Sequence, residues 1–322
     1  MHYNLPYKTK QFLFLLIKLS IVVGAFYFIY TKLFENSRLD IEQFLSVLHI
    51  NNSFSLKTVT ILLTLSICNW YFEILKWKHL VGTLKNISFK DALEQSLCGL
   101  TASLITPNRI GEYGAKAIYF AKPYRKRIVL LNLIGNISQM AITTILGIVG
   151  SILFVNLYSI EVDYFKITKI IFGFVLVRSL TAFGISKVSL RVKGYSMREI
   201  LIHVKALGSL THLKTLLFSL MRYAIFSFQF YYLLKFFGVD ISYFAAMIVI
   251  TSMYFLASII PSISIFDVVV KGSVAVFLFS FIEVNELIVL SITTIMWLLN
   301  FALPSLFGGY YVMNFKLPSA NE

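Results

Sequence analysis

The chain has 322 residues, of which 58% are hydrophobic and only 14% are charged, and its formal net charge is +14. Soluble domains carry about 25% charged residues, so a soluble globular protein is excluded. A nucleic-acid-binding domain gathers its basic residues on a polar folded face, whereas here they lie between hydrophobic segments, so nucleic acid is excluded as a partner. We therefore expect one integral membrane domain, residues 1–322.

Seven segments have the roughly 20 apolar residues that a bilayer-spanning helix needs. They are residues 11–30, 58–78, 128–157, 167–186, 214–237, 243–260 and 287–313. The first follows a short tail, residues 1–10, and lacks a small-residue cleavage site, so we expect an uncleaved helix. The predicted fold class is all-α, a polytopic membrane protein with about seven spanning helices plus two re-entrant or broken helical hairpins.

Lysine and arginine predict the orientation, because cytoplasmic loops of membrane proteins are enriched in them. With a cytoplasmic N-terminus, seventeen lie in loops on that side and five in loops on the other. The seventeen are Lys8, Lys10, Lys76, Lys78, Lys85, Lys90, Lys122, Arg125, Lys126, Arg127, Lys187, Arg191, Lys193, Arg198, Lys205, Lys214 and Lys316. The five are Lys32, Arg38, Lys57, Lys166 and Lys169.

A motif of proline, acid and lysine occurs twice in the apolar sequence, as Pro107, Glu112, Lys116 and as Pro261, Asp267, Lys271. The first lies in segment 91–121, which has cytoplasmic basic residues on both sides. We therefore expect a re-entrant hairpin with its tip at the first proline, or a helix embedded in the membrane surface. The second lies in segment 243–281, which is expected to enter from the opposite face. Broken helices opposed in this way occur in transporters.

The residues around these breaks predict a binding site for an anionic or phosphate-bearing lipid headgroup. A helix N-terminus favours anions, and Thr106 or Asn108 is placed to cap it. Arg109 adds a forked donor, and Gly111 allows close approach of the backbone. The predicted binding residues are Asn108, Arg109, Gly111, Glu112, Lys116, Ser262, Ser264, Asp267 and Lys271, and Arg178 and Arg222 are expected to line the same cavity.

A purely structural reading stays open, in which both acid–lysine pairs are buried salt bridges that fix helix packing. Glu73, Lys76 and Trp77 are interpreted as residues of the membrane interface, and Pro304 as a helix kink. Residues 186–214 form either a basic amphipathic cytoplasmic segment on anionic lipid or an ordinary loop. Cys68 and Cys98 indicate neither a disulfide framework nor a metal site, there is no Walker motif, and no cofactor is expected.

At the two proline–acid–lysine motifs the chain resembles the integral membrane region of lysylphosphatidylglycerol synthases, which also occurs as stand-alone flippase-like proteins. The family's P-[GN]-R-[IAL]-G-E stretch is matched by residues 107–112, with a basic residue following at Lys116. Its second proline stretch is matched at Pro261, Asp267 and Lys271, without the family's glycines and Arg-Glu pair. The resemblance spans residues 11–313.

The resemblance implies lipid handling in a bacterial cytoplasmic (inner) membrane, with a phospholipid or a polyprenyl-phosphate lipid as the partner. The family's aminoacyltransferase domain is not in these 322 residues, so no enzyme activity is expected. The leading hypothesis is a lipid translocase. One alternative is a non-transporting subunit that binds lipid or a partner enzyme of envelope synthesis. Another is an intramembrane enzyme using Glu112 or Asp267 as acid or base, which no nucleophile arrangement supports.

Overall fold

The computed structural model describes residues 55–104, 106, 109–158, 191–192, 195–196, 202, 204–259 and 264–316, together with Leu16, Leu19, Ser20, Val23, Gly24 and Tyr27. For residues 264–270 it describes the backbone alone. The predicted span 167–186 lies outside these residues, and so does most of the predicted span 11–30.

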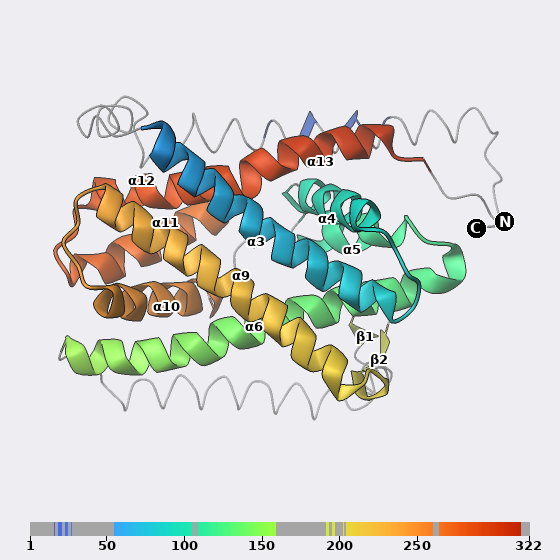
Figure 1. Cartoon of the computed structure of the whole chain (residues 1–322), viewed down its shortest axis with the longest axis horizontal. Coiled ribbons are helices and arrows are strands. Elements are labelled where there is room, and N and C mark those ends of the chain that lie inside the picture. The colour runs from blue at the N-terminus through green and yellow to red at the C-terminus, as the bar shows by residue number, and fades with distance from the viewer. Residues whose placement is uncertain are drawn as a thin grey trace.

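The described part of the chain is a bundle of helices (Figure 1). The helices are α3 (Leu56–Gly82), α4 (Phe89–Leu104), α5 (Ile110–Ala117), α6 (Lys122–Leu157), α9 (Ser209–Phe236), α10 (Tyr243–Ile259), α11 (Ser264–Ser280), α12 (Glu286–Trp297), the π-helix η2 (Leu298–Ala302) and α13 (Leu303–Asn314). Within the described residues one feature departs from the all-α expectation. Strands β1 (Arg191–Val192) and β2 (Tyr195–Ser196) form a short antiparallel pair inside segment 186–214.

Local sequence sets several helix ends. The Ser55 hydroxyl accepts the Thr58 N–H at 3.2 Å and caps α3, and the Asn285 side chain accepts the Leu287 N–H at 2.8 Å before α12. Pro123 lies in the first turn of α6, where a missing N–H is tolerated. Gly238, with a φ of 76°, follows α9 in the left-handed conformation that commonly ends a helix.

Among the described residues, three helices are long and apolar enough to cross a membrane: α3, α6 and the continuous run Glu286–Asn314. Helix α6 begins six residues before the predicted span, and its 36 residues extend over about 54 Å. The predicted span 214–237 corresponds to α9, which is long enough to cross a membrane but is not as apolar as these three. Arg222 and Gln229 lie in its middle, and they face other helices of the bundle.

The last apolar run contains a π-helix, and Pro304 explains why it forms there. Pro304 has no N–H, so a helix through this point leaves a carbonyl without its usual donor. The structure changes register just before the proline: the Leu303 N–H bonds to the Leu298 carbonyl, five residues back. The carbonyls of Leu299 and Asn300 are then satisfied by α3, which donates the Ser66 hydroxyl at 2.6 Å and the Trp70 indole N–H at 3.0 Å.

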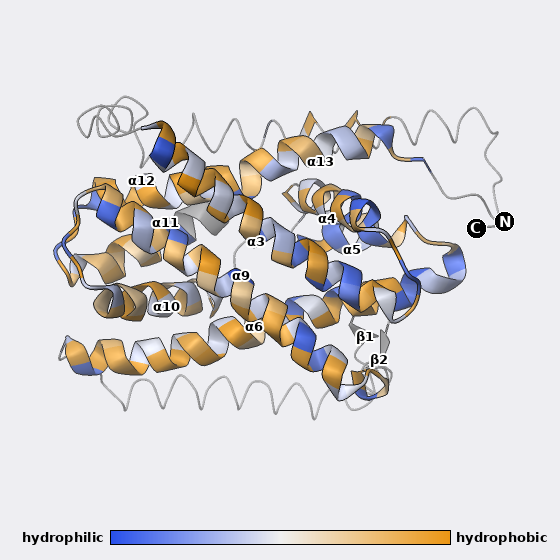
Figure 2. Ribbon diagram, viewed as in Figure 1, coloured by the Kyte–Doolittle hydropathy of each residue, from blue (hydrophilic) through white to orange (hydrophobic). Residues whose placement is uncertain are grey.

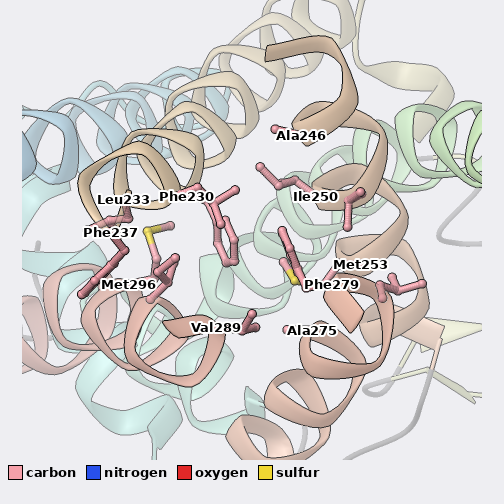
Figure 3. Close-up of a cluster of buried hydrophobic side chains, with 14 of the residues drawn as sticks. Phe230, Leu233, Phe237, Ala246, Ile250, Met253, Ala275, Phe279, Val289 and Met296 are labelled. Carbon is pink, nitrogen blue, oxygen red and sulfur yellow. The ribbon is translucent and has the colours of Figure 1, made fainter. Parts of the chain in front are cut away.

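The two ends of the bundle differ in polarity (Figure 2). At one end, side chains of α9, α10, α11 and α12 point toward one another and form an apolar core (Figure 3), in which the rings of Phe230 and Phe279 stack with centroids 5.5 Å apart. At the other end, hydrophilic residues gather on α5 and on the neighbouring ends of α3, α6 and α9. The candidate site lies at this second end.

Candidate functional site

Helices α4 and α5 form a tight hairpin that brings the first proline–acid–lysine motif into the bundle. A Cβ atom placed on Gly111 would lie 2.2 Å from the Ala102 carbonyl oxygen, so only glycine fits at this crossing. The Thr106 hydroxyl accepts the Gly111 N–H at 2.8 Å, although the N-cap position of α5 is held by Arg109, whose side chain makes no capping bond. The close approach that Gly111 permits is therefore to α4.

Lys116 of α5 is almost wholly buried, with 2% of its side chain exposed, and it has three partners. Its ammonium lies 2.8 Å from Glu112 Oε1 and donates to the Asn132 side-chain oxygen of α6, also at 2.8 Å. The ammonium also lies 4.3 Å from the centre of the Trp77 ring, a cation–π distance. Gly99 of α4 makes room, since a Cβ there would lie 3.1 Å from Glu112 Cγ.

Glu73 of α3 is the centre of a second set of buried ion pairs. Its Oε2 atom is 2.7 Å from Lys76 Nζ and 2.6 Å from the Arg222 guanidinium of α9. The Arg222 Nε–H also donates to the Asn69 side-chain oxygen at 3.1 Å. One expectation is therefore wrong: Lys76 is not a loop cation, because it is buried within α3 with Glu73 and Trp77. The interpretation of these three residues as interface residues concerns their depth in the membrane and stays a prediction.

The two sets of ion pairs lie side by side, because Trp77, whose ring contacts the Lys116 ammonium, directly follows Lys76 in α3. Arg109 joins at the rim, with a guanidinium nitrogen 3.6 Å from Glu112 Oε2 and 48% of its side chain exposed. Arg109 also has a φ of 56°, an uncommon conformation for any residue but glycine. We name Glu73, Lys76, Arg109, Glu112, Lys116 and Arg222 the charge cluster. It contains four cations and two carboxylates.

One donor beside the charge cluster lacks a hydrogen-bond acceptor within the described residues. Asn132 Nδ2 has no partner there, whereas the nearby Lys76 Nζ lies 2.7 Å from a single carboxylate oxygen, Glu73 Oε2. Both residues are at most 3% exposed. They lie near each other in the bundle, since a Cβ on Gly135, one turn after Asn132, would be 3.8 Å from Lys76 Cε. Buried donors without acceptors are costly, so this place favours a ligand rich in acceptor oxygens.

The structure brings together part of the predicted site. Arg109, Gly111, Glu112, Lys116 and Arg222 belong to or adjoin the charge cluster. Asn108, Arg178 and Ser262 lie outside the described residues, and only the backbone is described for Ser264 and Asp267, as part of α11.

Lys271 of the second hairpin is exposed, and its ammonium lies 5.9 Å from the centre of the Phe301 ring in the π-helix. Phe301 in turn packs with Leu97 and Leu100 of α4. The second hairpin therefore approaches the first through an apolar side chain, and the predicted meeting of its tip with Arg109 stays a prediction.

Sequence reasoning missed the part of the site on α3 and α6, although a signal was available. Ser66, Asn69, Glu73 and Lys76 recur at intervals of three or four residues within an apolar helix, which places them on one face. Asn132 begins a similar polar face on α6, where Asn136 donates to the Tyr113 hydroxyl at 3.0 Å. A polar stripe in a spanning helix indicates contact with protein or a ligand.

Comparison of the chain with models of known protein families gives no match, and comparison with curated proteins gives none. The likeness to lysylphosphatidylglycerol synthases is carried by the short motifs at residues 107–116 and 261–271 alone.

Proposed function

We propose that the protein is a flippase-like lipid translocase that binds a phosphate-bearing lipid headgroup at the charge cluster. The observation that carries the proposal is the surplus of positive charge and of hydrogen-bond donors inside the bundle. Four cations, one of them Arg109 at the rim, face two carboxylates, and the Asn132 Nδ2 donor lacks an acceptor among the described residues.

A phosphate group matches both surpluses. It supplies negative charge, and its oxygen atoms accept several hydrogen bonds from ammonium, guanidinium and amide groups. A lipid headgroup that enters the cluster replaces water with fixed donors, and this lowers the cost of moving the headgroup through the hydrocarbon layer. The half-exposed Arg109 is placed to make the first contact, because it lies at the rim of the cluster.

We also propose the membrane topology that the sequence predicts. The chain crosses a bacterial inner membrane about seven times with its N-terminus in the cytoplasm, and the hairpins at 91–121 and 243–281 enter from opposite faces. Alternate opening of the two hairpins exposes the cluster first to one leaflet and then to the other. The motif at residues 107–116 supports this choice, because it resembles that of flippase-like proteins.

Exchange of a fluorescent phospholipid between the leaflets of proteoliposomes tests the proposal. Arg109→Ala keeps the buried ion pairs, and Glu112→Gln removes one, and we expect both to slow exchange. Asp240→Asn, which removes an exposed partner of Lys235, is the control that leaves exchange unchanged. Wild-type rates in both cluster variants would remove the cluster from the mechanism.

The alternative, a non-transporting membrane subunit, is favoured by one observation: both carboxylates of the cluster are already paired with two cations each. This function predicts no phospholipid exchange by the purified protein and stable co-purification with an envelope-synthesis enzyme such as a glycosyltransferase.

A further inference from the structure

A line of buried amide side chains connects the charge cluster to the π-helix. The Asn69 amide donates to the Asn300 side-chain oxygen at 2.8 Å, and the Asn300 amide donates to the Gln229 side-chain oxygen at 2.9 Å. The Gln229 amide ends the line on the Leu62 carbonyl at 3.1 Å. All three amides are at most 2% exposed.

Arg222 at one end, together with the Met296 and Leu62 carbonyls, fixes the direction of the bonds in this line. A guanidinium has donors only, so Asn69 must turn its oxygen toward Arg222 Nε and its NH₂ group toward Asn300. Asn300 must then present its oxygen to Asn69 and its NH₂ group to Gln229. The orientation of one amide is thus coupled to that of the next, as in other buried polar networks.

The middle amide of the line lies in an irregular segment of its helix. Asn300 is the central residue of the π-helix, and short π-helices are frequent at functional sites. Its amide also donates to the Met296 carbonyl at 3.0 Å, so the side chain bridges α3, α9 and its own helix. A change of register before Pro304 would move this amide and release Asn69.

We propose that Asn300 is a positioning residue for headgroup binding. It holds Asn69, Asn69 holds Arg222 in the charge cluster, and the conformation of the π-helix is thereby coupled to the affinity of the cluster for phosphate. This inference rests on the proposed function, and it assigns a role to residues that contact no headgroup themselves.

The test combines substitutions of Asn300 and Arg222 in the full-length protein. Asn300→Ala interrupts the line, and Arg222→Lys keeps the charge but removes the Nε donor that Asn69 accepts. We expect each single variant to raise the phosphatidylglycerol content that gives half-maximal exchange in proteoliposomes by about tenfold, with the maximal rate retained. The half-maximal phosphatidylglycerol content of the double variant should be no higher than that of Arg222→Lys alone, because the line is already broken in the single variant.

Thr101→Val is the matched control. It removes a buried hydrogen bond of 2.8 Å from the Thr101 hydroxyl of α4 to the Ser305 carbonyl of α13. Ser305 lies in the same apolar run as Asn300 but outside the amide line. Its half-maximal lipid content should equal that of the wild type. A tenfold rise in this control, or effects of Asn300→Ala and Arg222→Lys that multiply in the double variant, would overturn the inference while leaving the proposed function intact. Absence of exchange in the wild-type protein would overturn the proposed function itself.

Discussion

The two helical hairpins carry the same motif of proline, acid and lysine, yet they occupy different surroundings. In the first hairpin, Glu112 and Lys116 are buried in a network with α3 and α6. In the second, the helix that carries Lys271 packs its apolar face into the core around Phe230, and the lysine itself is exposed. The spacing of the charges therefore does not decide whether they become buried.

Small residues and polar partners on neighbouring helices explain why the pair of the first hairpin is buried. Gly99 leaves space for the acid and the lysine of the first hairpin, and Asn132 and Trp77 provide partners for the ammonium. Helix α11 presents large apolar side chains at its buried positions, such as Leu278 and Phe279. A charge is stable inside a bundle only where such partners exist.

The largest expected effect follows from breaking a buried pair in the first hairpin. Glu112→Gln leaves the Lys116 ammonium buried without its carboxylate, and we expect the unfolding free energy to fall by about 3–5 kcal/mol. Thermal unfolding in detergent measures this. The exposed Lys235–Asp240 pair is the comparison, and Asp240→Asn should leave the unfolding curve unchanged. A loss in Glu112→Gln as small as in Asp240→Asn would show that the network contributes little.

An intermediate effect is expected at the crossing of α4 and α5. Gly111→Ala drives a methyl group into the Ala102 carbonyl, so the two helices must separate, at a cost of about 1–3 kcal/mol or more. Gly114→Ala in the same helix meets no atom within 4 Å and should stabilise the protein by up to about 1 kcal/mol. Thermal unfolding of the two variants gives opposite shifts, and shifts of the same sign would contradict the described hairpin.

The smallest effect is expected in the second hairpin. Lys271→Met loses a contact with the Phe301 ring that is worth about 0.5–1 kcal/mol at an exposed site. Lys116→Met, its counterpart in the first hairpin, should cost several times more, since it leaves Glu112 buried with only the half-exposed Arg109. Equal losses of stability in the two variants would remove the contrast between the hairpins.

Much of the fold follows from the sequence, because runs of apolar residues define helices regardless of their neighbours. The predictions at 58–78, 243–260 and 287–313 all correspond to helices, and Pro304 does disturb its helix. The site was predicted only in part. Glu112 and Lys116 stand out as a pair within one helix, whereas the link between Glu73 and Arg222 joins residues 149 positions apart. Such contacts depend on how helices pack, which spacing along the chain does not specify.

The central claim is that the charge cluster binds the phosphate of a lipid headgroup, and thermal unfolding with matched lipids tests it most directly. Phosphatidylglycerol and diacylglycerol with the same acyl chains differ by the phosphate-bearing headgroup. We expect phosphatidylglycerol alone to raise the Tm of the wild-type protein, because a ligand stabilises the state that binds it. The rise should be lost in Asn132→Leu, which removes a donor that has no acceptor within the described structure. Equal rises with both lipids, or an undiminished rise in Asn132→Leu, would contradict the claim.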